Sequence, residues 1–174
     1  MNRTHEMRFT GSGGQGIILA SVILTEAALI AGYNAVQSQS YGPEARGGLC
    51  KAEVLVCEDE IGFAKVVSPT FLLALTQSSL DRYSVDVPND CIIMADSSLS
   101  QPENAKKVVF VPILETAKAK VGKSFVANIV AIAAVNAHLK LVPDAALKEA
   151  VLKHIPKGTE ELNLKALEEG SKLI

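Results

Sequence analysis

The chain has 174 residues, of which 48% are hydrophobic and 21% charged, and its formal net charge is -2. These values are typical of one compact globular domain and exclude extensive disorder. The weak negative charge and the lack of a long run of Lys and Arg exclude an electrostatic nucleic-acid binder and a polybasic membrane anchor.

The start of the chain and its two most apolar segments are not expected to enter a membrane. Residues 1–8 are charged and lack an apolar stretch, so no secretory signal is predicted. Segments 17–31 and 125–141 contain polar residues such as Glu26 and Asn128. A spanning helix needs about 20 mostly apolar residues. Both segments are therefore predicted to be buried helices.

The sequence contains three cysteines, at Cys50, Cys57 and Cys91. They are too widely spaced for a zinc or iron–sulfur site on this chain, and their number argues against a disulfide framework. We therefore expect three small buried apolar side chains in a protein of the reducing cytoplasm.

Strand and helix patterns alternate along most of the chain. Strands are expected at 7–10, 35–37, 49–57, 71–75, 91–95 and 108–111, with 61–63 as a hairpin partner of 49–57. Helices are expected at 16–30, 79–83, 113–120, 125–138, 145–154 and 159–169, and Gly32 and Gly170 are expected to end two of them. This alternation predicts an α/β fold, a three-layer Rossmann-like domain with a mainly parallel sheet and a helical C-terminal part, in a single domain over 1–174.

A glycine cluster follows the first expected strand and precedes the first expected helix. Its members are Gly11, Gly13, Gly14 and Gly16, with Gln15 between the last two. Such a turn lets a ligand approach the backbone, and the helix N-terminus favours an anion. The spacing fits G-x-G-x-x-G, but residues 36–40 supply no acid for a ribose, and no Lys follows for a P-loop. The turn therefore predicts a general anion or phosphate site, or serves only close strand–helix packing.

A second motif occupies the loop after the second expected strand, where open α/β sheets bind ligands. It reads Ser-Tyr-Gly-Pro-Glu-Ala-Arg-Gly-Gly over residues 40–48. Arg46 can clamp a phosphate or carboxylate through two hydrogen bonds. Glu44 can pair with Arg46 or a partner, and Tyr41 can stack or donate a hydrogen bond. Gly42 and Gly47 complete the candidate binding residues; a solvent loop with a local ion pair is the alternative.

The two motifs together resemble the gamma subunits of 2-oxoacid:ferredoxin oxidoreductases. The resemblance extends from about Met7 to Gly170 and includes Pro69, Asn128 and the segment 163–166. It implies a non-autonomous subunit of an oxidoreductase that acts on the oxo group of a 2-oxoacid and has an iron–sulfur protein as acceptor. The products that the resemblance implies are an acyl-CoA, carbon dioxide and reduced ferredoxin. By resemblance, the two motifs face the partner subunits near the cofactor and coenzyme A site.

The resemblance also implies where the cofactors lie. The complex is expected to use thiamine diphosphate, Mg²⁺, iron–sulfur clusters and coenzyme A, whereas this chain alone carries no catalytic or metal-binding residue. The sequence has no Gly-Asp-Gly motif and no C-x-x-C-x-x-C run. Alpha, beta and delta subunits are the implied partners, with ferredoxin reached through the complex. The favoured substrate is 2-oxoglutarate, followed by branched-chain oxoacids or pyruvate. A free-standing phosphate- or nucleotide-binding module and a purely structural assembly subunit remain alternatives.

Overall fold

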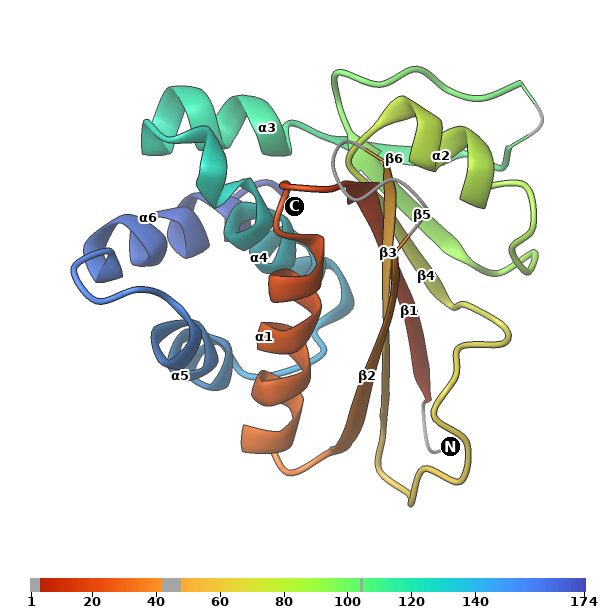
Figure 1. The fold of residues 1–174 in the computed structure, drawn as a ribbon, viewed down its shortest axis with the longest axis horizontal. Coiled ribbons are helices and arrows are strands. Elements are labelled where there is room, and N and C mark those ends of the chain that lie inside the picture. The colour runs from red at the N-terminus through yellow and green to blue at the C-terminus, as the bar shows by residue number, and fades with distance from the viewer. Residues whose placement is uncertain (1–3, 42–47, 104) are drawn as a thin grey trace.

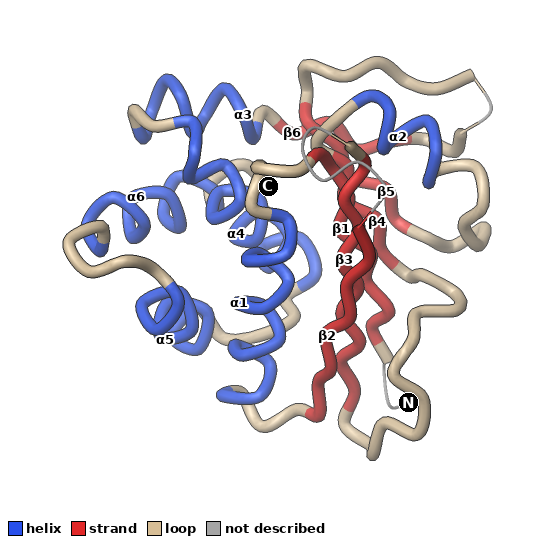
Figure 2. The backbone as a smooth tube through the Cα atoms, viewed as in Figure 1, coloured by secondary structure: helices blue, strands red, loops and turns tan. Residues whose placement is uncertain are grey.

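A computed structural model describes residues 4–41, 48–103 and 105–174. Its centre is a six-stranded sheet in the order β2-β3-β1-β4-β5-β6 (Figure 1). The strands are β1 (His5–Ser12), β2 (Asn34–Tyr41), β3 (Leu49–Cys57), β4 (Phe71–Ala74), β5 (Ile92–Asp96) and β6 (Val108–Val111). Helix α2 (Gln77–Tyr83) lies on one side of the sheet, and the other helices lie on the opposite side (Figure 2). The predicted three-layer α/β architecture is confirmed.

Strand direction brings five strand ends to one edge of the sheet. β1, β4, β5 and β6 are mutually parallel, whereas β3 runs antiparallel to both β1 and β2. β2 therefore runs in the same direction as β1, and only β3 is reversed, so the expected mainly parallel sheet is confirmed. We call the edge at which β1, β2, β4, β5 and β6 end the carboxyl edge.

The main core lies between the sheet and the helices α1 (Ile17–Ile30) and α4 (Ala127–Leu139). On β1, Met7 and Phe9 point to these helices and are fully buried. α4 is apolar around most of its circumference and is buried along most of its length, as expected for a central helix. A smaller core, which includes Leu72, Leu80 and Ile93, lies beneath α2.

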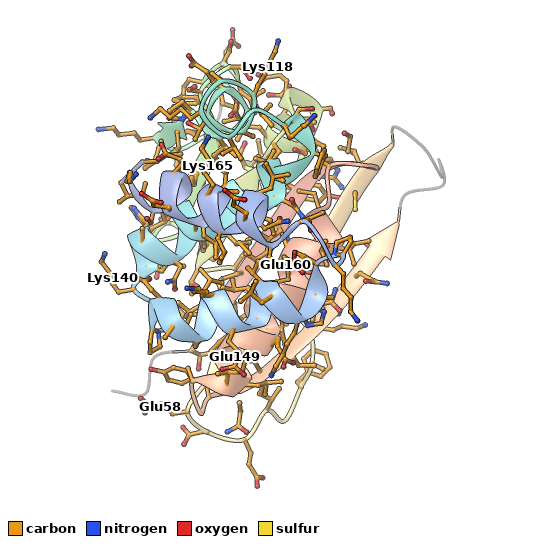
Figure 3. All side chains as sticks on the ribbon, turned by 90° about the vertical axis from the view of Figure 1, so that its left-hand side faces the viewer. Glu58, Lys118, Lys140, Glu149, Glu160 and Lys165 are labelled. Carbon is orange, nitrogen blue, oxygen red and sulfur yellow. The ribbon has the colours of Figure 1, made fainter. Side chains whose placement is uncertain are left out.

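Two further helices, α5 (Asp144–His154) and α6 (Glu160–Ser171), pack against α1 and α4 and extend the helical layer. Figure 3 shows their outer side, where Glu149, Glu160 and Lys165 are exposed charged side chains. The sequence predicted both helices, the first at 145–154 and the second at 159–169. Among the helices of the described residues, none is long and apolar enough to cross a membrane.

The structure corrects three local predictions. Residues 61–63 form no strand, and Phe63 is exposed; the hairpin partner of β3 is β2, which continues to Tyr41. The predicted helix at 113–120 is a short α3 (Ile113–Glu115) followed by a π-helix, η1 (Thr116–Val121). A 3-10 turn, η2 (Ser124–Val126), then precedes α4.

Gly32 ends α1 as predicted. Its φ is +88°, its amide donates to the Leu29 carbonyl, and the Tyr33 amide donates to the Ala28 carbonyl. This pair of hydrogen bonds is a Schellman motif, which favours glycine because the left-handed conformation penalises a Cβ atom.

The prediction that Gly170 ends the last helix was wrong, because α6 continues to Ser171. Gly170 is buried where α6 crosses α4. A Cβ atom there would lie 2.5 Å from the Val130 carbonyl oxygen and 2.7 Å from the Ala133 Cβ. The glycine therefore sets the close approach of the two helices.

Replacing Gly170 with alanine is expected to lower the free energy of unfolding by about 2 kcal/mol, because overpacking against fixed backbone typically costs 1–3 kcal/mol. Urea unfolding followed by circular dichroism measures the change. Ser171→Ala, on the next and exposed residue of the same helix, is the matched control. Equal stability of the two variants would contradict the packing role of Gly170.

Candidate functional site

The glycine turn connects β1 to α1 at the carboxyl edge. Gly11 is a buried residue of β1, and Gly16, with φ +74°, immediately precedes the first residue of α1. Gly13 and Gly14 are exposed between them. Gly14 has φ +95°, and no atom of the described residues lies within 4 Å of the position that its Cβ would take. The middle of the turn therefore presents bare backbone to the outside.

The outer glycines of the turn are required by close packing. A Cβ on Gly11 would lie 2.5 Å from Oε1 of Gln15, and a Cβ on Gly16 would lie 2.7 Å from Nδ2 of Asn128 on α4. Close strand–helix packing therefore accounts for the glycines at Gly11 and Gly16. It does not account for Gly14, which has open space around it.

The side chain of Gln15 holds the turn closed. Its Oε1 accepts a hydrogen bond from the Ser12 amide at 2.8 Å, and its Nε2 donates to the Leu75 carbonyl at 3.3 Å. The Leu75 amide in turn donates to the Thr10 carbonyl at 3.0 Å. Gln15 thus ties the turn to the end of β4. The contact with a cofactor expected for Gln15 stays a prediction.

The second motif begins and ends beside the glycine turn. The Gly13 amide donates to the Gly48 carbonyl at 3.1 Å, and Cys50 on β3 pairs with Gly11 on one side and with Tyr41 on the other. The start of β3 therefore lies between the ends of β1 and β2, and the described residues of the two motifs meet at the carboxyl edge of the sheet, as predicted.

Part of the predicted site lies outside the described part of the chain. This part comprises Gly42, Glu44, Arg46, Gly47 and the side chain of Tyr41. Their roles stay predictions. What the structure supplies is the position of the loop's two ends.

The turn retains amide groups that can bind an anion. Within the described part of the chain, the amides of Gly14 and Gly16 donate to no protein acceptor, and neither do those of residues 17–19 in the first turn of α1. The first intrahelical hydrogen bond runs from the Ala20 amide to the Gly16 carbonyl at 2.9 Å. The positive end of the α1 dipole lies here, so the exposed surface at Gly14 favours a negative group.

The rest of the carboxyl edge is engaged in internal hydrogen bonds. Asp96 is buried, and its Oδ1 accepts from the Ser98 amide at 2.9 Å while its Oδ2 accepts from the Leu114 amide at 2.7 Å. Asp96 thus caps the end of β5 and the start of α3. At the end of β4, Thr76 accepts from the Ser79 amide and caps α2.

The described cysteines are buried and unpaired, as predicted. Burial raises the pKa of the Cys91 thiol to about 11, and burial also raises the pKa of the Cys50 thiol. Both thiols are therefore protonated at neutral pH and are poor nucleophiles. Over the described residues, no group of three or more His, Cys, Asp and Glu side chains is arranged to hold a metal ion.

Asn128 is a residue of this site that sequence reasoning left without a role. It is buried at the start of α4, and its side chain lies against Gly16, with Nδ2 3.5 Å from the Gly16 carbonyl oxygen. In the sequence it is only a polar interruption of an apolar helix. Its contact depends on tertiary packing between residues more than a hundred positions apart, for which the sequence gives no local signal.

Comparisons with known proteins identify the family of the chain. The family model described as pyruvate ferredoxin/flavodoxin oxidoreductase matches residues 6–173. The 2-oxoglutarate synthase subunit KorC of Methanocaldococcus jannaschii is 41% identical over 170 residues, which cover 95% of this chain and 91% of that protein. The crystal structure of a keto/oxoacid ferredoxin oxidoreductase gamma subunit from Geobacter sulfurreducens is 42% identical, with a TM-score of 0.88 over 98% of this chain and 96% of that one.

A larger enzyme contains the same fold. The 2-oxoglutarate:ferredoxin oxidoreductase of Magnetococcus marinus, solved with 2-oxoglutarate, coenzyme A and succinyl-CoA bound, matches 99% of this chain with a TM-score of 0.89. The match covers 31% of that chain at 19% identity and so shows the fold alone.

The mainly parallel sheet and the glycine turn define a Rossmann-like α/β fold whose carboxyl edge suits an anion. The family match over 6–173 and the relatives at about 40% identity make the assignment specific. The chain belongs to the pyruvate ferredoxin/flavodoxin oxidoreductase family, as a protein of the gamma-subunit type.

Proposed function

We propose that this chain is the gamma subunit of an enzyme that oxidatively decarboxylates 2-oxoglutarate with coenzyme A, yielding an acyl-CoA, carbon dioxide and reduced ferredoxin. The observation that carries the choice of 2-oxoglutarate is the 41% identity to a 2-oxoglutarate synthase subunit over nearly the full length of both chains. We also propose that residues 1–174 form a single domain and that the enzyme works in the cytoplasm.

The proposed role of the carboxyl edge is to hold an anionic group of coenzyme A. The exposed Gly14, the N-terminus of α1 and the amides of Gly14 and Gly16, which have no acceptor among the described residues, fit a phosphate because each supplies a donor or a positive dipole. Arg46 is proposed to reach the same group from the loop. Coenzyme A, when bound, supplies the thiol that receives the acyl group.

The remaining chemistry is assigned to other subunits. Thiamine diphosphate with Mg²⁺ and the iron–sulfur clusters are proposed to lie on alpha, beta and delta subunits, through which electrons pass to ferredoxin. The role proposed for this chain is to orient and cover the coenzyme A site, so it has no activity alone.

A free-standing phosphate-binding module is the second candidate, supported by the same glycine turn. Calorimetry separates the two proposals: such a module binds coenzyme A or a nucleotide as the isolated chain, whereas a gamma subunit binds it weakly until the partners complete the site.

A substrate panel tests the proposed function. The tagged chain is purified with its partners, and reduction of a viologen dye is followed with 2-oxoglutarate, pyruvate and a branched-chain 2-oxoacid, each with coenzyme A. We expect the highest kcat/KM for 2-oxoglutarate. Preference for another 2-oxoacid would overturn the substrate assignment, and absence of larger partner chains would overturn the subunit role.

A further inference from the structure

The sheet has a region that no helix covers. On the side of α2, that helix packs mainly over β1 and β4 and reaches β3 only in part, whereas the edge strand β2 extends beyond it (Figures 1 and 2). The side chains there come from alternate strand positions: Ser38 and Ser40 on β2, Lys51 and Glu53 on β3, and Arg8 on β1. We call these five residues, with Tyr83 of α2 beside Arg8, the open sheet face.

Two cations on this face share one carboxylate oxygen. Nε of Arg8 lies 2.8 Å from Oε1 of Glu53, and Nζ of Lys51 lies 3.1 Å from the same atom. The Arg8, Lys51 and Glu53 side chains are 14%, 25% and 9% exposed. They are largely withdrawn from water, so their charges are not fully screened. The triad carries a net charge of +1.

The Arg8 guanidinium uses only part of its hydrogen-bonding capacity. Its carbon lies 5.9 Å from the centre of the Tyr83 ring, which holds the group in place. Within the described part of the chain, Nε is its only nitrogen with an acceptor. The two terminal nitrogens can therefore donate hydrogen bonds to a second carboxylate, because a guanidinium pairs with a carboxylate through two parallel hydrogen bonds.

The shape of the open sheet face suits a protein surface. Ser40 is exposed and Ser38 is half-buried, and these two small side chains flank the triad on β2, the edge strand. An incoming segment therefore approaches the triad over small polar residues. A second copy of this chain would bring the same positive charge against itself, and like charges at an interface oppose association.

We infer that the open sheet face docks another subunit of the oxidoreductase, which places an Asp or Glu side chain against Arg8 and Lys51. The inference rests on the proposed function, because it requires the chain to work in an assembly. It adds to that function a specific contact surface, which the glycine turn and the second motif do not include.

Two substitutions test the docking surface. Lys51→Gln removes one cation without leaving Glu53 unpaired, since Arg8 remains. Ser40→Glu places a carboxylate directly across from Lys51, because Ser40 and Lys51 are paired in the β2–β3 register and share a face. Binding is measured between the immobilised full-length chain and the partner subunits that co-purify with the wild-type chain. We expect each variant to raise Kd about 10-fold or more, and the salt dependence of Kd to be weaker for Lys51→Gln.

Gln39→Glu is the matched control, because it adds the same charge one residue away on the opposite face of β2. Its Kd is expected to stay within about 2-fold of wild type, since a charge that faces away from the interface changes affinity little. If wild type and all variants assemble equally and reduce viologen, the docking inference fails while the proposed function stands. An equal loss in Gln39→Glu would also overturn the inference, and a wild-type chain that binds no partner would overturn both.

Discussion

Replacing Gly16 with alanine is expected to lower the free energy of unfolding by about 2–5 kcal/mol. The left-handed backbone at φ +74° costs an alanine about 1–2 kcal/mol, and the overlap with Asn128 adds about 1–3 kcal/mol. The new Cβ would lie 2.7 Å from Nδ2 and 2.9 Å from Cγ of Asn128, and Asn128 is itself buried at the start of α4. Urea unfolding measures the loss.

A control and a double mutant separate the two causes. Gly62→Ala, at a glycine without positive φ and with no atom within 4 Å of its Cβ position, is expected to leave stability within about 0.5 kcal/mol. Asn128→Ala removes the overlap but not the backbone strain, so the double mutant should lose about 1–3 kcal/mol less than the sum of the single mutants. A Gly16→Ala variant as stable as wild type would contradict the geometry of this contact.

Replacing Arg46 with alanine in the assembled enzyme is expected to raise the KM for coenzyme A about 30-fold or more. Losing one partner of a desolvated charged contact typically costs 2–5 kcal/mol. The KM for the 2-oxoacid should change little, because the proposed contact is with coenzyme A alone. Steady-state viologen reduction at varied coenzyme A gives both constants.

Arg46→Lys distinguishes charge from geometry at this position. Lysine keeps the positive charge but lacks the planar pair of donors, so an intermediate KM is expected. An unchanged KM and kcat in Arg46→Ala would remove the ligand role of Arg46 and leave it a structural residue of the loop.

Features determined by neighbours in the sequence were predicted well. The apolar run and the terminal glycine of α1 define that helix and its Schellman ending at Gly32, because both depend on residues within a few positions. The spacing of the glycine cluster between strand and helix likewise located the turn. The resemblance of the two motifs to gamma subunits placed the whole chain in its family.

Features determined by distant contacts were not predicted. The insertion of β3 between β2 and β1 depends on non-local pairing, so the alternation of Leu49–Cys57 revealed a strand but not its neighbours. Gly170 lies near the end of its helix, as a terminating glycine would, yet its role is set by the backbone of α4 at Val130, which leaves no room for a side chain. The Arg8–Glu53–Lys51 triad joins two strands whose register the sequence does not specify.

The central claim is that this chain is a required gamma subunit of a 2-oxoacid:ferredoxin oxidoreductase. The most direct measurement prepares the partner subunits without this chain and follows coenzyme A-dependent viologen reduction with 2-oxoglutarate before and after the purified chain is added back. We predict little activity without the chain and recovery that saturates at one chain per assembly. Full activity in its absence, or no recovery on its addition, would contradict the claim.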